Sequence, residues 1–107
     1  MTNSAVYRID KFIVPMPSKA RFLERLRITH DMLDQAEGCE QNLLLEQVDG
    51  TGRFNVITFV QWRNAACYAA ARQQSLAAQA ATGFDPAAFM QELGVIADLA
   101  DYHALVP

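Results

Sequence analysis

The segment 56–62, Val-Ile-Thr-Phe-Val-Gln-Trp, constrains the fold most strongly because both of its faces are apolar. Successive side chains of a strand point to opposite sides, so Val, Thr, Val and Trp share one face while Ile and Phe occupy the other. The segment 39–48 repeats this pattern, with Leu44 opposite Leu43 and Leu45. A sheet built from such strands needs cover on both faces, because a large exposed apolar face favours association.

The N-terminal half of the chain predicts a strand, an amphipathic helix and a hairpin. Residues 5–14 are rich in Val, Tyr, Ile and Phe and end at Pro15 and Pro17, which cannot donate to a sheet, so this segment predicts a strand. Ser18 is a suitable N-cap, and apolar residues then recur at helical spacing as far as Gly38, which predicts a helix ending at that glycine. The hairpin is predicted from strands 39–48 and 53–62 with the turn Asp49-Gly50-Thr51-Gly52 between them.

The C-terminal half predicts two helices and a last strand. Asn64 can cap a helix over the alanine-rich residues 65–81, because alanine has the highest helix propensity. Asp85 precedes a proline, which predicts a short helix over 86–93, and a glycine follows each of the two helices. Residues 95–106 carry the apolar residues of a strand, with two aspartates interrupting the pattern.

The predicted order β-α-β-β-α-(α)-β is that of an α+β, ferredoxin-like split β-α-β fold with an antiparallel four-stranded sheet. A chain of 107 residues has room for one hydrophobic core, so we expect a single domain over 5–106 with a tail at 1–4. The helices of this fold cover one face of the sheet. We therefore expect a second copy of the chain to cover the other face, which makes the protein a homodimer through the sheet face.

Composition and charge exclude several classes of partner. The chain has 9 basic and 12 acidic residues and a net charge of -3, and no stripe of Lys or Arg predicts nucleic-acid binding. No apolar run has the roughly 18 to 20 residues of a membrane span, and the N-terminus has no signal-peptide pattern, so we expect a cytoplasmic protein. Cys39 and Cys67 lack the spacing of a metal or redox motif and are interpreted as reduced thiols. With only His30 and His103 in the chain, no metal site is predicted.

Two stretches carry a more specific pattern, Thr29-His30-Asp31-Met32-Leu33 with Glu37-Gly38-Cys39, and Phe59-Val60-Gln61-Trp62-Arg63-Asn64 leading to Tyr68. Together they resemble the antibiotic biosynthesis monooxygenase family, whose members are dimeric α/β-barrel proteins with a ferredoxin-like fold. The family includes cofactor-free oxygenases that form quinones from phenolic polyketides, and haem-degrading monooxygenases. The resemblance covers nearly the whole chain, and it implies a fold more specifically than an activity.

The quinone-forming type is the nearer match, because Gln61-Trp62 and Tyr68 stand where that type has Gln-Trp and a Tyr six residues later. The quinone-forming type has an Asn in the strand before the Trp, where this chain has Thr58. It also has a pocket Arg late in the second helix, and residues 81–83 of this chain offer no counterpart. The haem-degrading type uses an Asn in the first strand and a His after the Trp. Here the first strand offers Ile9 and Lys11, and Arg72 lies ten residues beyond the Trp. The resemblance therefore implies a cofactor-free oxidation and no haem.

The candidate catalytic residues are His30, Trp62 and Tyr68. A phenol must lose a proton before it can pass an electron to O2, so a base or hydrogen-bond donors must meet its oxygen, and His30 is the best candidate base. Each of the three also has a purely structural interpretation, as a core tryptophan, a packed tyrosine or a satisfied core or interface histidine. The candidate substrate-binding residues, which could instead fill the core or lie on a solvated helix face, are Phe22, Leu26, Thr58, Arg72, Phe89 and Met90.

Three functions are consistent with these residues. The first is a cofactor-independent monooxygenase acting on a small phenolic or quinol-type, polyketide-like aromatic molecule. The second is a binding or regulatory dimer of the same fold without catalysis, which the missing Asn and Arg favour. The third is an isomerase or decarboxylase that acts through an enolate in the same pocket.

Overall fold

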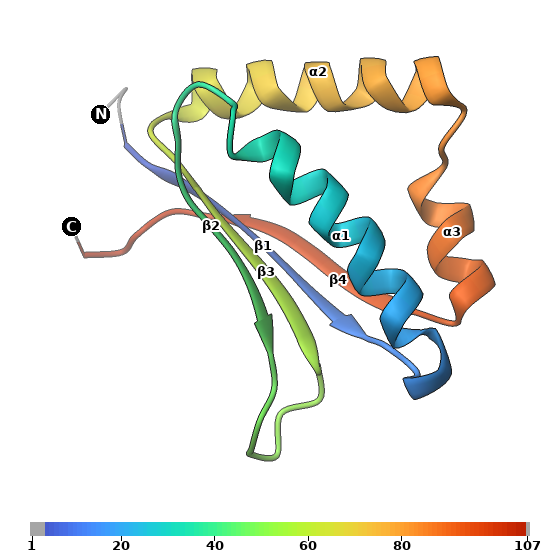
Figure 1. Ribbon diagram of the computed structural model, residues 1–107. Helices are drawn as coiled ribbons and strands as arrows, with labels where there is room; N and C mark the ends of the chain where they lie inside the picture. The colour runs from blue at the N-terminus through green and yellow to red at the C-terminus, as the bar shows by residue number, and fades with distance from the viewer. Residues whose placement is uncertain (1–3, 107) are drawn as a thin grey trace.

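The computed structural model describes residues 4–106, so positions 1–3 of the predicted tail and residue 107 lie outside the described residues. The chain forms four strands, three α-helices and one 3-10 turn (Figure 1). In chain order these are β1 (Val6–Ile13), η1 (Met16–Ser18), α1 (Lys19–Leu33), β2 (Cys39–Glu46), β3 (Val56–Trp62), α2 (Ala65–Thr82), α3 (Pro86–Leu93) and β4 (Ile96–Tyr102).

The four strands form one antiparallel sheet in the order β2-β3-β1-β4, so the first and third strands lie at its centre. All three helices lie on the same side of this sheet, and no helix or strand of residues 4–106 covers the other side (Figure 1). This is the predicted α+β, ferredoxin-like arrangement. The central strands β1 and β3 therefore carry the side chains that meet the helices.

Helix boundaries follow local capping at some positions and tertiary contacts at others. The Asn64 side chain accepts a hydrogen bond from the Cys67 backbone N–H at 2.9 Å, and Asp85 caps α3 in the same way, as predicted. The predicted Ser18 cap is wrong, because its hydroxyl donates to the Leu93 carbonyl at 2.7 Å and does not cap α1. The first helix also ends at Leu33, five residues before the predicted stop.

The strands are shorter than the sequence predicts, with the largest difference in the hairpin. Strand β2 ends at Glu46 and β3 begins at Val56. The connection between them is therefore nine residues long instead of the predicted four-residue turn. The Asn55 side chain explains part of this difference, because it exchanges hydrogen bonds with both backbone groups of Val14, beyond the end of β1. Asn55 thus joins the hairpin to the neighbouring strand.

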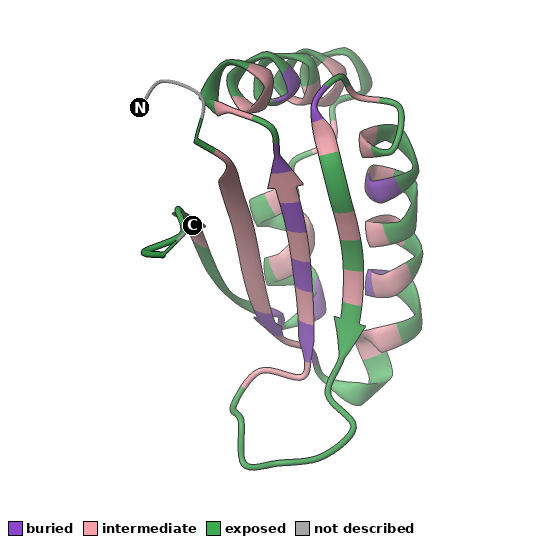
Figure 2. Cartoon of the chain, turned by 90° about the vertical axis from the view of Figure 1, so that its left-hand side faces the viewer, coloured by how far each residue is buried: buried purple, intermediate pink, exposed green. Residues whose placement is uncertain are grey.

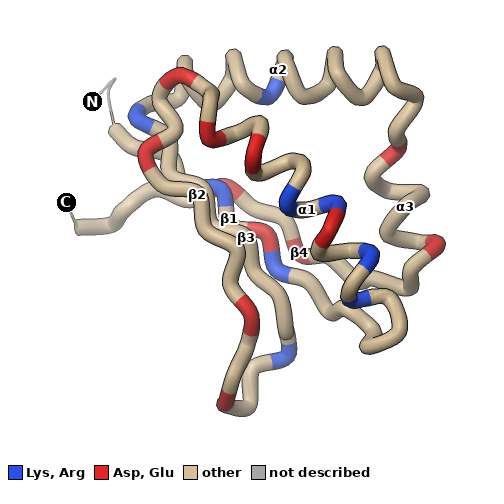
Figure 3. The backbone as a smooth tube through the Cα atoms, viewed as in Figure 1, with Lys and Arg blue, Asp and Glu red and all other residues tan. Residues whose placement is uncertain are grey.

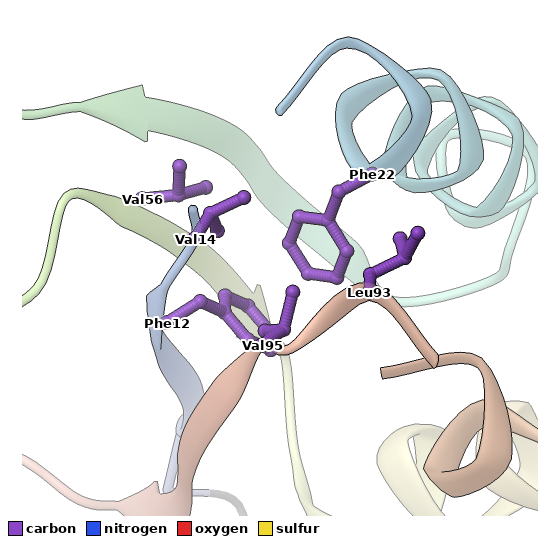
Figure 4. Packing of buried hydrophobic residues seen from close by; sticks show 6 residues of the cluster. All are labelled: Phe12, Val14, Phe22, Val56, Leu93 and Val95. Carbon is purple, nitrogen blue, oxygen red and sulfur yellow. The ribbon is translucent and has the colours of Figure 1, made fainter. Parts of the chain in front are cut away.

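The main core lies between one end of the sheet and the helices α1 and α3. Phe22 reaches from α1 toward Phe12, Val95 and Leu93, with Val14 and Val56 closing the cluster (Figure 4). The ring centroids of Phe12 and Phe22 are 5.0 Å apart in an edge-on arrangement. A second cluster of Val60, Trp62 and Ala71 lies under α2.

The sheet face opposite the helices is largely apolar and uncovered by the described chain (Figure 2). The strand registers pair Ile9 with Phe59 on this face, and Phe59 with Leu43. Leu43 and Leu45 are 45% and 46% exposed, and Ile96 is 54% exposed. We call this surface the open face, and its large apolar residues are Tyr7, Ile9, Ile13, Leu43, Leu45, Ile57, Phe59, Ile96 and Tyr102.

Gly38 sits where only glycine fits, which gives a testable prediction. Its φ is +82°, and a Cβ at this position would lie 2.5 Å from both Cβ and Sγ of Cys67. Gly38→Ala should therefore lower the free energy of unfolding by about 3 kcal/mol, combining left-handed strain with a clash. Gly50→Ala is the matched control in urea denaturation, because Gly50 has φ +106° in open space and should lose only about 1 kcal/mol. Equal losses in the two variants would contradict the proposed contact.

Candidate functional site

A cavity of about 230 Å³ lies between the sheet, α1 and α2. It is bounded by apolar side chains of the sheet and the two helices, including Phe12, Leu33, Val60 and Ala71. Six of the residues singled out in the sequence line it together. They are His30 and Leu26 from α1, Thr58 and Trp62 from β3, and Tyr68 and Arg72 from α2.

The other three predicted binding residues do not line this cavity. Phe22 is 2% exposed in the main core, and Phe89 and Met90 pack against that core. Their assignment to the pocket is corrected by the fold. Helix α3 and the N-terminal end of α1 cover the opposite end of the sheet, so their apolar side chains meet each other there.

Helix α1 carries His30 into the cavity from its last turn, and the residue is 8% exposed. Burial lowers the pKa of His30, and the nearby Asn42, Asp34 and Asp31 offset only part of this effect. The imidazole is therefore neutral at pH 7. The Nδ1 atom is buried and has no well-aligned hydrogen-bond partner within residues 4–106, although the Asn42 side chain lies near the ring. A neutral histidine can both donate and accept a hydrogen bond, so it is suited to bind a hydroxyl group.

Trp62 and Tyr68 meet at one end of the cavity. Trp62 is the last residue of β3 and Tyr68 lies in the first turn of α2, so the short connection brings them together. Their ring centroids are 6.1 Å apart with an interplanar angle of 40°. Trp62 is only 2% exposed, so it forms a wall of the cavity as well as part of the second core cluster.

A charged network that the sequence analysis did not single out lies beside these rings. Arg8 Nε donates to Asp10 Oδ1 at 2.7 Å, and Arg8 Nη1 donates to Asp101 Oδ1 at 3.1 Å and to the Tyr68 hydroxyl at 3.2 Å. Tyr68 in turn donates its O–H to Asp101 Oδ1 at 2.7 Å. Strand alternation was the available signal, because Arg8 and Asp10 share the helix-facing side of β1 with the buried Phe12.

The network shifts the pKa of each of its members. Burial raises the pKa of Asp10, and Arg8 offsets only part of that shift. Burial and the hydrogen bond to Asp101 raise the pKa of Tyr68, which is therefore a neutral phenol at pH 7. Burial lowers the pKa of Arg8, but the two carboxylates more than compensate and keep it charged. For Asp101, the hydrogen bonds from Tyr68 and Arg8 outweigh burial and lower its pKa.

Three polar groups on the cavity have no partner within residues 4–106. They are the Asp10 Oδ2 atom and the Thr58 hydroxyl, neither of which is buried as an atom, and the buried His30 Nδ1 atom. They come from β1, β3 and α1. Buried polar groups are nearly always hydrogen-bonded in proteins, so the unpaired His30 Nδ1, with two unpaired oxygens from other residues of the same cavity, is suited to a small polar ligand or ordered water.

Basic residues occupy the first part of α1, with one Glu among them, whereas acidic residues lie at its end and in the turn that follows (Figure 3). Arg72 lines the cavity rim with an exposed side chain and forms no ion pair with the described residues.

No group of three or more His, Cys, Asp or Glu within residues 4–106 is arranged to hold a metal ion. Among the same residues, no helix combines the length and apolarity that a membrane crossing needs.

Solved structures with the same fold were found, although no protein-family model matches the chain and no curated sequence is similar enough to count as a relative. A "putative monooxygenase" from Shewanella loihica is 20% identical over 100% of both chains, with a TM-score of 0.73. An asparagine-to-alanine variant of SnoaB, a cofactor-independent oxygenase from Streptomyces nogalater, is 18% identical over 97% of this chain and 96% of that chain, with a TM-score of 0.71.

A third similar structure has a different chemistry. MhuD, a heme degrader from Mycobacterium tuberculosis solved with two hemes in its active site, is 17% identical over 95% of this chain and 97% of that chain, with a TM-score of 0.69. These identities are low, so the similarity establishes the shared fold and leaves the reaction to the residues of the site. The fold is the one that the resemblance to the monooxygenase family implies.

Proposed function

We propose that this chain, which shares its fold with cofactor-independent oxygenases, oxidises a small hydroxylated aromatic molecule with O2 and without a bound cofactor. The observation that carries the proposal is the apolar cavity on which His30, Thr58 and Asp10 present polar atoms without protein partners. Pockets for drug-sized ligands occupy about 300 to 1,000 Å³, so a cavity of about 230 Å³ is of a size for one or two aromatic rings.

The reaction that this site would perform needs a substrate that supplies all of the electrons. A phenol that becomes a quinone gains one oxygen atom and loses two hydrogens, and the second oxygen atom of O2 leaves with those hydrogens as water. Loss of the hydroxyl proton comes first, because the anion donates an electron to O2 far more readily than the neutral phenol. The site must therefore supply a base, hydrogen bonds to the oxygen and an apolar enclosure.

Within this proposal the predicted site residues have distinct roles. The neutral His30 and the Thr58 hydroxyl hold the substrate oxygen, and Trp62 lies along the cavity as an aromatic wall. Tyr68 contacts the charged network through its hydroxyl, and its ring lies beside Trp62 at that end of the cavity. Leu26 lines the apolar part, and Arg72 stands at the rim.

A second copy of the chain is the proposed partner, bound through the open face. Monomeric soluble proteins rarely expose apolar patches larger than a few hundred Å², and the open face runs across all four strands. Its centre carries the Tyr7 and Phe59 rings, whose centroids lie 5.8 Å apart. A two-fold dimer would pack this surface against itself and leave the cavity, on the opposite side of the sheet, free to bind a substrate.

Oxygen consumption tests the proposed reaction. We expect the chain to consume O2 with anthrone-type substrates, with one oxygen atom of ¹⁸O2 in the quinone product. His30→Ala and Tyr68→Phe should each lower kcat/KM by at least about tenfold, because each removes a hydrogen bond at the site. Met32→Ala on the exposed side of α1 is the matched control and should leave the rate unchanged. Turnover without O2 would indicate the enolate isomerase or decarboxylase, and binding without turnover would indicate the non-catalytic binding module.

A further inference from the structure

We propose that Asp10 is the base that takes the hydroxyl proton of the bound aromatic substrate, an assignment that rests on the proposed function. The O–H bond of the substrate breaks, a new O–H bond forms at Asp10 Oδ2, and the electron pair stays on the substrate oxygen. The substrate leaves this step as a phenolate and Asp10 as a neutral carboxylic acid.

The position of Asp10 in the sheet supports this assignment. It lies in the centre of β1, paired with Thr58 of β3 on one side and Leu99 of β4 on the other, and its side chain lines the cavity. Its Oδ1 atom is held by Arg8 Nε at 2.7 Å, which fixes the orientation of the carboxylate. Within residues 4–106, the hydrogen bond and ion pair of Asp10 use Oδ1 only, and Oδ2 accepts no hydrogen bond. One oxygen is therefore anchored, and the other is free to accept a proton.

The charge balance of the cavity favours Asp10 over His30. Transfer of a proton from a neutral phenol to Asp10 moves one negative charge from the carboxylate to the phenolate, beside the same Arg8 guanidinium. No new charge is created in the apolar cavity. Transfer to the neutral His30 would create a separate cation and anion there, which low-dielectric surroundings disfavour.

The remaining groups around Asp10 are already occupied. Asp101 accepts hydrogen bonds from both Tyr68 and Arg8, and the Tyr68 hydroxyl proton is committed to Asp101. Arg72 lies at the exposed rim of the cavity, and its charge acts on Asp101. Since Arg8 is neutralised by two carboxylates, the cavity is suited to a neutral hydroxyarene and poorly suited to a carboxylate or phosphate ester.

The kinetic test compares Asp10→Asn with His30→Gln on a substrate that wild type oxidises. Asp10→Asn should lower kcat by about 10² to 10⁴-fold with little change in KM, because the amide still fills the site but cannot take the proton. His30→Gln should affect KM more than kcat. Asp10→Gly should regain activity when formate is added, since a small carboxylate can occupy the vacated space. Unchanged kcat in Asp10→Asn, or no rescue by formate, would overturn the assignment.

A second measurement does not depend on turnover. 4-Nitrophenol is coloured only as its anion, so absorbance reports the protonation of the bound molecule. Bound to wild type, it should have a higher pKa than in water, because the Asp10 carboxylate faces its hydroxyl. In Asp10→Asn this pKa should fall by at least about one unit, the size expected for removal of an adjacent charge. Met32→Ala, on the exposed side of α1, should leave it unchanged. Equal values in wild type and Asp10→Asn would overturn the assignment.

The two measurements separate the two proposals. One outcome is that wild type consumes no O2 with any substrate while Asp10→Asn still lowers the pKa of bound 4-nitrophenol. In that case the proposed oxygenase function is wrong, and the position of Asp10 beside the substrate hydroxyl is supported. If Asp10→Asn consumes O2 at the wild-type rate, only the Asp10 assignment fails. If wild type binds no nitrophenol, the proposed ligand class fails and the assignment fails with it. The variant should remain folded in urea denaturation, because burial raises the Asp10 pKa and its ionised form therefore costs stability at neutral pH.

Discussion

Phe22→Ala is expected to lower the free energy of unfolding by about 3 to 5 kcal/mol, the loss typical of a buried Phe truncated to Ala. Phe22 is 2% exposed, and its ring meets Phe12 edge-on and stacks over Phe89 at a centroid distance of 6.5 Å. These contacts join α1 to the sheet and to α3, so the cavity left by the truncation cannot close easily. Urea denaturation at a fixed protein concentration measures the loss.

The controls for Phe22 separate packing from substrate binding. Ile28→Ala on the same helix removes a side chain that is 47% exposed, and should cost less than about 1 kcal/mol. Phe22→Leu keeps much of the volume and should recover most of the lost stability. A Phe22→Ala protein with wild-type stability and no activity would show instead that Phe22 contacts the substrate, as the sequence first suggested.

The double substitution of Leu43→Glu and Leu45→Glu is expected to convert a dimer into monomers. Both leucines are roughly half exposed in the single chain, so glutamate is tolerated there in a monomer. In a dimer packed through the open face the same carboxylates would be buried without partners, at several kcal/mol each, and the dissociation constant should rise at least about a thousandfold. Size-exclusion chromatography with light scattering at micromolar concentration measures the change.

The matched control for the dimer is Val48→Glu, in the hairpin connection. Val48 is 95% exposed and lies outside the open face, so this variant should keep twice the 11.9 kDa chain mass, as wild type should. A wild-type mass of one chain would refute the dimer. A double variant that stays at the dimer mass would instead refute the open face as the interface.

The elements that the sequence predicted best are those fixed by neighbouring residues. Helix α3 has the predicted bounds because Asp85, the proline after it and Gly94 act within one turn of its ends. Helix α2 extends one residue beyond its predicted end and carries the predicted Asn64 cap. Trp62 and Tyr68 were placed at one site because a strand end and the next helix start are separated by only two residues.

The errors arose where distant residues set the local structure. The glycine pattern predicted that α1 runs to Gly38, but that glycine serves a turn whose backbone carbonyl accepts a hydrogen bond from Arg63 and whose Cα lies against Cys67. Ser18 resembles an N-cap, but the Leu93 carbonyl lies within reach of its hydroxyl. In both cases a residue with a local preference met a partner that only the folded chain supplies.

The sequence by itself determined the class of the fold, the apolar character of both sheet faces and the candidates His30, Thr58, Trp62 and Tyr68 on the helix side, because strand alternation and helix spacing are local properties. Only the tertiary structure decided which of these residues share a cavity. It also brought Asp101, 93 residues after Arg8, into hydrogen-bonding distance of that arginine, because β4 pairs with β1. That pairing created the charged network around Asp10, and a charge pattern along the chain cannot specify such a contact between strands at opposite ends of the sequence.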